Sequence, residues 1–94
     1  MAISYRAAQN LIKRGDVDGL ASALENGLQS NLTNENGWTL LMLAAVEGNV
    51  ALGALLLSKG ADGTRQNTKG QTARTIATSR GFSAFADLLP AEGA

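Results

Sequence analysis

Apolar side chains recur along this chain in short blocks with helical spacing, and glycines separate the blocks. In the first block, residues 5–14, Ala7, Ala8, Leu11 and Ile12 fall on one face of a helix, opposite basic and amide side chains. Helices this short are marginal alone in water, so they must pack on one another. Similar patterns predict further helices at residues 17–25, 40–47, 50–58, 73–79 and 83–89. The side chains expected to point inward from them include Leu20, Ala23, Leu24, Leu52, Leu55, Leu56, Phe85, Leu88 and Leu89.

Residues that stop and start helices lie between the blocks. Glycine tolerates the left-handed conformation that closes a helix, and the expected stops are Gly15, Gly27, Gly48, Gly60 and Gly81. Polar side chains can accept the free N–H groups of a first turn, and the expected N-caps are Asp16, Thr39, Asn49 and Thr72. Residues 28–37 and 61–70 are rich in turn formers, with Asn36-Gly37 the strongest turn signal, and Pro90 is expected to close the last helix.

A shift of 33 positions superimposes the chain on itself. The shift aligns Gly15 with Gly48 and Gly81, Gly37 with Gly70, Thr39 with Thr72, Ala44 with Ala77, and Leu55-Leu56 with Leu88-Leu89. A period in this range is the signature of stacked arrays in which each unit packs on its neighbours. We therefore expect one all-α domain over residues 1–94, with repeats at about 1–33, 34–66 and 67–94. Three nearly whole repeats indicate a complete small protein.

The middle copy is the clearest one. It reads Gly37-Trp38-Thr39-Leu40-Leu41-Met42-Leu43-Ala44-Ala45, then Glu47-Gly48-Asn49, then Leu55-Leu56-Leu57-Ser58-Lys59-Gly60-Ala61-Asp62. It resembles the ankyrin repeat, whose pattern is D-x-x-G-x-T-P-L-H-x-A-A-x-x-G-H followed by L-L-L-x-x-G-A-D. The third copy keeps Gly70, Thr72, Ala77, Gly81, Leu88 and Leu89, and the first keeps Gly15, Leu24 and Gly27. The resemblance covers nearly the whole chain and implies an ankyrin-like solenoid of about three helix–turn–helix units joined by β-turn-type connections.

The sequence departs from the family pattern at positions that bear on stability. Leu40 replaces the family's proline, and Met42 replaces its histidine, so the hydrogen bond that this histidine makes between turns is expected to be lost. In the third copy, Arg74 and Thr75 replace leucine and histidine, which fits a terminal repeat with one solvated face. Gly53 stands where the family has an apolar residue. An interior glycine costs about 1 kcal/mol relative to alanine. If Gly53 is buried against the next repeat, its small size would allow closer packing.

Composition argues against catalysis. The chain has no cysteine and no histidine, which removes thiolate chemistry, the commonest general base and the commonest transition-metal ligand. The segment Asp16-Val17-Asp18-Gly19 lacks the other oxygen ligands of a calcium loop, and Gly60-Ala61-Asp62-Gly63 lacks the Gly-Lys-Ser/Thr of a phosphate loop. We therefore expect no enzyme, no cofactor and no metal.

The charge and the hydropathy restrict the surroundings of the chain. Its eight basic and eight acidic residues cancel, so it has no overall positive field to attract nucleic acid or an anionic membrane. The first residues lack the apolar core of a signal peptide, and the longest apolar run, residues 40–46, is far too short to cross a bilayer. These features predict a soluble, cytoplasmic domain.

The family resemblance implies a concave binding surface made by the turn tips and the outward ends of the first helices. The corresponding positions hold, in one row, Tyr5, Trp38 and Gln71; in a second row, Lys13-Arg14, Val46-Glu47 and Ser79-Arg80; and at the tips, Glu35, Asn36, Thr68 and Lys69. Trp38 is the only tryptophan and the expected anchor, because tryptophan is enriched at binding hot spots. The structural alternatives stay open: Trp38 covers the edge of its own repeat, Tyr5 caps the first repeat, and Arg14 and Arg80 are solvated charges.

The sequence therefore predicts a non-catalytic module that binds another protein on the concave face of the stack, as a monomer or weak homodimer. One alternative is a dedicated inhibitor or immunity-type protein that blocks a single enzyme. A second is a scaffold that only provides stability, which the irregular first copy argues against. Nucleic-acid binding ranks low, since Lys13-Arg14 is the only adjacent basic pair.

Overall fold

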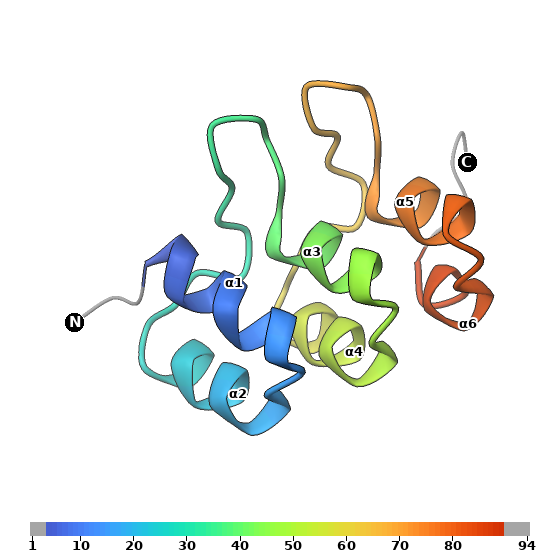
Figure 1. The fold of residues 1–94 in the computed structure, drawn as a ribbon. Coiled ribbons are helices and arrows are strands. Elements are labelled where there is room, and N and C mark those ends of the chain that lie inside the picture. The colour runs from blue at the N-terminus through green and yellow to red at the C-terminus, as the bar shows by residue number, and fades with distance from the viewer. Residues whose placement is uncertain (1–3, 90–94) are drawn as a thin grey trace.

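The computed structural model describes residues 4–89, which form three helix pairs stacked side by side (Figure 1). The helices are α1 (Tyr5–Arg14), α2 (Val17–Glu25), α3 (Leu40–Glu47), α4 (Val50–Ser58), α5 (Ala73–Ser79) and α6 (Ser83–Ala86). One row contains α1, α3 and α5, which pack on one another in that order, and the other contains α2, α4 and α6. We call these the inner and the outer row. Two long connections project as hairpin-like loops from the same side of the stack. The predicted all-α repeat array is confirmed.

The predicted bounds agree with five of the six helices, and the sixth is shorter than expected. Helix α6 ends at Ala86, because Leu88 and Leu89 donate their N–H groups to the carbonyls of Phe85 and Ala86, three residues back, at 3.0 and 3.1 Å. The predicted extension of this helix to residue 89 is therefore wrong. Phe85 and Leu89 are buried as expected, whereas Leu88 is only half-buried. Pro90 lies outside the described residues.

The inward face of α1 also needs a correction. Ala8 and Ile12 are buried and Leu11 is half-buried, but Ala7 is exposed. The residue at the equivalent position of α3, Leu40, is fully buried. Within the described residues no helix pair lies beyond α1, so nothing covers Ala7 on that side.

Side-chain caps begin five of the six described helices. An oxygen of each cap accepts a backbone N–H three residues ahead, and the caps are Ser4, Asp16, Thr39, Asn49 and Thr72. The bond from the Gly19 N–H to Asp16 Oδ1 measures 2.8 Å, so this carboxylate serves as a helix cap. Helix α6 lacks a side-chain cap, because Phe82 stands at the position that Asp16 and Asn49 hold in the other pairs.

Met42 changes the cap of α3. Its sulfur lies 3.5 Å from the Thr39 N–H, while the Thr39 hydroxyl accepts from the Met42 N–H at 3.1 Å. A thioether is a weak acceptor, so this sulfur provides a weak reciprocal bond within one turn. Met42 is otherwise a core residue, 1% exposed.

Each hairpin is closed by an asparagine at its base. Asn34 Oδ1 accepts the N–H groups of Asn36 and Trp38 at 2.9 and 3.0 Å, and the Asn34 N–H donates to the Trp38 carbonyl at 3.2 Å. Asn67 makes the same three kinds of bond one repeat later. The Thr68 N–H donates to the Asn36 carbonyl at 3.0 Å, so the two hairpins are also bonded to each other.

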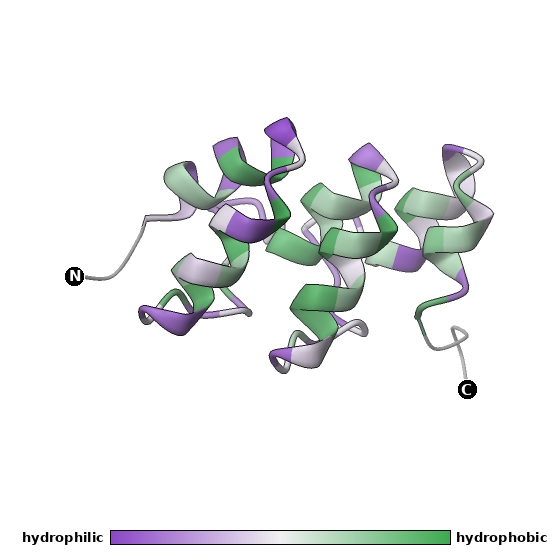
Figure 2. Ribbon diagram, turned by 90° about the horizontal axis from the view of Figure 1, so that it is seen from below, coloured by the Kyte–Doolittle hydropathy of each residue, from purple (hydrophilic) through white to green (hydrophobic). Residues whose placement is uncertain are grey.

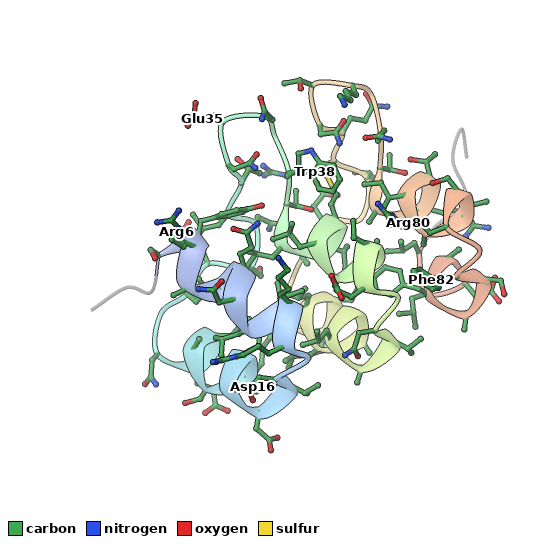
Figure 3. All side chains as sticks on the ribbon, viewed as in Figure 1. Arg6, Asp16, Glu35, Trp38, Arg80 and Phe82 are labelled. Atoms are coloured by element: carbon green, nitrogen blue, oxygen red, sulfur yellow. The ribbon has the colours of Figure 1, made fainter. Side chains whose placement is uncertain are left out.

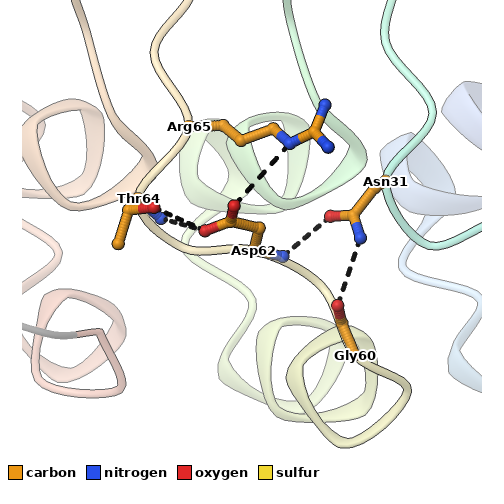
Figure 4. Close-up of polar contacts among 5 residues, drawn as sticks. All are labelled: Asn31, Gly60, Asp62, Thr64 and Arg65. Carbon is orange, nitrogen blue, oxygen red and sulfur yellow. Dashed lines mark hydrogen bonds and ion pairs between the residues drawn. The ribbon is translucent and has the colours of Figure 1, made fainter.

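Asn31 joins the first two helix pairs on the outer side (Figure 4). Its amide nitrogen donates to the Gly60 carbonyl at 3.2 Å, and its amide oxygen accepts from the Asp62 N–H at 2.7 Å. The Asp62 carboxylate accepts from the Thr64 hydroxyl and N–H, and the hydroxyl bond is the larger cause of its lowered pKa. Arg65 lies 3.8 Å from the same carboxylate.

The core runs between the two rows and from pair to pair. Figure 2 shows hydrophobic residues where the helix pairs face one another and hydrophilic residues at the turns. Small residues allow the close approach: Ala44, Ala45 and Ala77 are fully buried, and Gly53 on α4 faces the ring of Phe85 on α6. The expectation that a small residue at position 53 permits tight packing is consistent with this contact.

Arg74 caps the C-terminal end of the described stack. Its guanidinium donates to the carbonyls of Ala86 and Leu89, both at 2.8 Å. Replacing Arg74 with methionine keeps a long side chain but leaves both carbonyls without this donor, so the free energy of unfolding should fall by about 2 kcal/mol. Urea unfolding followed by circular dichroism measures the change. Arg80→Met removes an exposed arginine and is the control; an equal loss in the two variants would contradict this role.

Candidate protein-binding surface

The inner helices and the two hairpins carry the residues that the sequence analysis predicts for partner binding. We call this the inner surface. Figure 3 shows Glu35 at the far end of the first hairpin and Trp38 nearer its base, above α3. Glu35 and Asn36 are exposed, as expected for a turn tip. Their amide and carboxylate groups are accessible to a partner, except that the Asn36 carbonyl is bonded to Thr68.

Trp38 is half-buried. Part of its ring packs against the hydrophobic core, and the rest is accessible. Its backbone is fixed at both ends, since its N–H donates to Asn34 Oδ1 and its carbonyl accepts from Asn34 N–H. These bonds fix the backbone, and the packing of the ring on the core orients the side chain, which contributes both to the repeat and to the accessible surface.

Gln71 occupies the equivalent position on the second hairpin and is also half-buried. Its side-chain oxygen accepts from Asn67 Nδ2 at 3.0 Å, and its N–H donates to Asn67 Oδ1 at 3.1 Å. These bonds hold the amide against its own hairpin. Gln71 thus has less freedom to bond a partner than its sequence position suggests.

Tyr5 begins α1 and is half-buried against the core, as the capping interpretation requires. Its hydroxyl oxygen is buried and has no hydrogen-bond partner among the described residues. Burial disfavours the tyrosinate and raises the pKa of Tyr5 to about 12. Because this hydroxyl is buried, Tyr5 offers a partner little polar surface.

Titration of Tyr5 can be measured directly, because it is the only tyrosine. The ultraviolet absorbance of tyrosinate should give a midpoint of about 12 in the folded chain and about 10 in urea. The folded pKa of Tyr5 is higher than the unfolded one, so the neutral hydroxyl contributes to the free energy of unfolding. This contribution is fully present below pH 10 and is lost as the pH rises towards 12.

Tyr5→Phe is the control for this titration. It removes the absorbance signal and the unpartnered hydroxyl, so the neutral-pH stability should rise by about 1 kcal/mol. A midpoint near 10 in the folded chain would show that the hydroxyl reaches solvent.

The second predicted row lies at the ends of the inner helices. Arg14, Glu47 and Arg80 are exposed, and Val46 is half-buried. Arg14 Nη2 lies 3.8 Å from Asp16 Oδ2, with 68% and 42% of the two side chains exposed, so this ion pair contributes little to stability. The arginines thus have the exposure expected of solvated charges, which leaves them accessible to a partner.

A shallow groove between α1 and α3 brings part of this row together. It has a volume of about 170 Å³ and is lined by Gln9, Ile12, Lys13, Leu43, Val46 and Glu47. Sequence reasoning missed Gln9 and Leu43 as groove residues, and the buried Ile12 forms the floor that they share with the core. Leu43 precedes Val46 by three positions, which places the two on one side of α3, and this spacing was the available signal.

No group of three or more His, Asp or Glu side chains that could hold a metal ion occurs within residues 4–89. None of the described helices is long and apolar enough to cross a membrane.

Stacked helix pairs, capping threonines and asparagine-closed hairpins define a helical repeat protein. The sequence profile of ankyrin repeats, in three copies, matches residues 5–94. The chain therefore belongs to the ankyrin-repeat family, whose repeats are non-catalytic modules that generally mediate protein–protein interaction.

Two curated relatives illustrate the contexts of similar segments. The chain is 41% identical over 76 residues to the human protein "NAD-capped RNA hydrolase NUDT12", and 34% identical over 76 residues to the mouse protein "Ankyrin repeat family A protein 2". These matches cover 80% and 81% of this chain, but only 16% and 24% of the relatives. The chain thus spans a quarter or less of the length of the relatives that it matches.

Proposed function

We propose that this chain binds a partner protein on its inner surface, with Trp38 as the anchor. The observation that carries the proposal is the placement of Trp38: it is held at the base of a hairpin and remains partly accessible above α3. A tryptophan that is already partly ordered loses little conformational entropy when a partner covers it. Family membership adds the general role in protein–protein interaction.

The other predicted residues of the inner surface suit the rim of an interface. Tyr5, Gln71, Val46 and Glu47 lie on the inner helices or hairpins and are accessible to different degrees. Arg14, Arg80, Glu35 and Asn36 are exposed polar residues, which are typical of a rim that stays in contact with water. Most of the binding energy should therefore come from Trp38 and the apolar groove.

The test begins with capture of partners from cells of the source organism and their identification by mass spectrometry. The dissociation constant of a captured partner is then measured with the wild-type chain and with Trp38→Ala. We expect Trp38→Ala to weaken binding by about 2 kcal/mol or more, close to thirtyfold, while the helical circular dichroism stays unchanged.

Val50→Ala is the matched control, because Val50 is an exposed apolar residue, 39% accessible, on the outer row. It should leave binding unchanged. If Trp38→Ala unfolds, Trp38 is needed for the fold, and its assignment as the binding anchor is wrong. Val46→Ala tests the surface itself in that case, and retained binding would place the interface elsewhere.

A further inference from the structure

The charges of this neutral chain are separated between its two rows. The outer helices and their caps carry four carboxylates and one ammonium group, which belong to Asp16, Asp18, Glu25, Asp87 and Lys59. The inner helices and hairpin tips carry five exposed basic residues and two exposed acidic ones: Arg6, Lys13, Arg14, Lys69 and Arg80 against Glu35 and Glu47. In the described part of the chain, Arg14 is the one of the five that lies within 4.0 Å of a carboxylate, that of Asp16. Arg74 is bonded to α6, and Asp62 pairs with Arg65. The inner surface is therefore positive although the whole chain is not.

These inner charges are largely unpaired. Among residues 4–89, no carboxylate lies within 4.0 Å of the charged groups of Arg6, Lys13, Lys69 or Arg80. All four residues are exposed. A surface with several unpaired charges of one sign attracts ligands of the opposite sign and speeds their association.

The groove between α1 and α3 lies within this positive surface. Leu43 and Val46 provide apolar walls, and Lys13 and Glu47 line the same space. Its volume of about 170 Å³ is below the range of about 300–1,000 Å³ that small-molecule sites occupy. The groove therefore has the size for an inserted side chain rather than for a whole small ligand.

We infer that the segment recognised by the inner surface is an acidic peptide that contains a large apolar residue. The apolar side chain would occupy the groove, and the carboxylates would face Lys13, Arg14, Lys69 and Arg80. This inference rests on the proposed function, because it assumes docking on the inner surface. The charges of Glu35 and Glu47 and the apolar groove favour a peptide over nucleic acid, whose phosphates need a continuous basic track.

The test starts from a random peptide library with no assumption about charge. Peptides of about 12 residues span about 40 Å when extended, close to the 37 Å long axis of the stack. Phage selection on the wild-type chain should enrich peptides with net negative charge and a large apolar residue. A synthetic copy of the enriched sequence, followed by fluorescence anisotropy, should bind about tenfold more weakly when the salt is raised from low to high concentration.

Single charge changes then locate the site. Lys13→Glu and Arg80→Glu should each weaken binding of the acidic peptide about tenfold, and Glu47→Lys should strengthen it. Lys59→Glu is the matched control, since Lys59 is the one basic residue on the outer row, and it should change the affinity less than about twofold.

The other outcomes separate this inference from the proposed function. Neutral or basic peptides that lose affinity in Val46→Ala would show that the inner surface binds peptides but does not select acidic ones. Two outcomes would contradict both proposals. In one, the selection enriches no peptide; in the other, the enriched peptides bind Val46→Ala and Lys13→Glu with the same affinity as the wild-type chain. Tighter binding of single-stranded poly(U) than of any selected peptide would assign the positive surface to nucleic acid and overturn the inference.

Discussion

Replacing Phe85 with alanine should lower the free energy of unfolding by about 3–5 kcal/mol, which is most of what a domain of this size has. Phe85 is the largest of the fully buried side chains, with 0% of its surface exposed. It belongs to α6, which has only four residues and no side-chain cap, so tertiary packing must hold this helix in place. Urea unfolding followed by circular dichroism and by Trp38 fluorescence measures the loss.

Phe82→Ala is the matched control for this prediction. Phe82 lies three positions earlier, is 36% exposed, and rests against Gly48 at the turn between α3 and α4. Its removal takes less apolar area out of the core and should cost about 1 kcal/mol. Equal losses in the two variants would mean that the ring at position 82 is as important as the buried one.

Most of the fold could be predicted because its signals are local. The caps Thr39 and Asn49 and the stops Gly15 and Gly48 act within one turn of the chain, and their residue types are strongly preferred at helix ends. The end of α6 could not be predicted in this way. It depends on bonds to residues three positions back and on a guanidinium from α5, and neither has a signal in the local pattern.

The site was less predictable than the fold, because exposure is a tertiary property. The repeat identifies Trp38 and Gln71 as outward positions, but it does not show that the ring of Trp38 rests partly on the core or that Asn67 holds the Gln71 amide. The net charge of zero also gives no sign that basic and acidic residues are separated between the two rows. It appears only when each charged residue is assigned to an inner or an outer helix.

Restoring the family's apolar residue at position 53 should destabilise the chain. Gly53→Leu is expected to lower the free energy of unfolding by about 3 kcal/mol, the upper end of the usual cost of overpacking. A β-carbon built at Gly53 would lie 2.6 Å from Phe85 Cε2, 2.9 Å from Phe85 Cζ and 3.0 Å from Leu88 Cδ1. Gly53→Ala gains about 1 kcal/mol of helix propensity, yet the same contact should leave it less stable than the wild type in urea unfolding.

The size of the Phe85 ring is the reason for this cost, and a double-mutant cycle tests it. Phe85→Leu removes Cε2 and Cζ, the two ring atoms that a β-carbon at position 53 would meet. Gly53→Ala combined with Phe85→Leu should therefore be more stable than the sum of the single changes predicts, by about 1 kcal/mol or more. Additive losses would show that the cost of alanine at position 53 does not come from the Phe85 ring. A positive coupling of this size would mean that Gly53 and Phe85 act as one packing unit. The glycine weakens helix α4, but it makes room for the side chain that holds α6 in place.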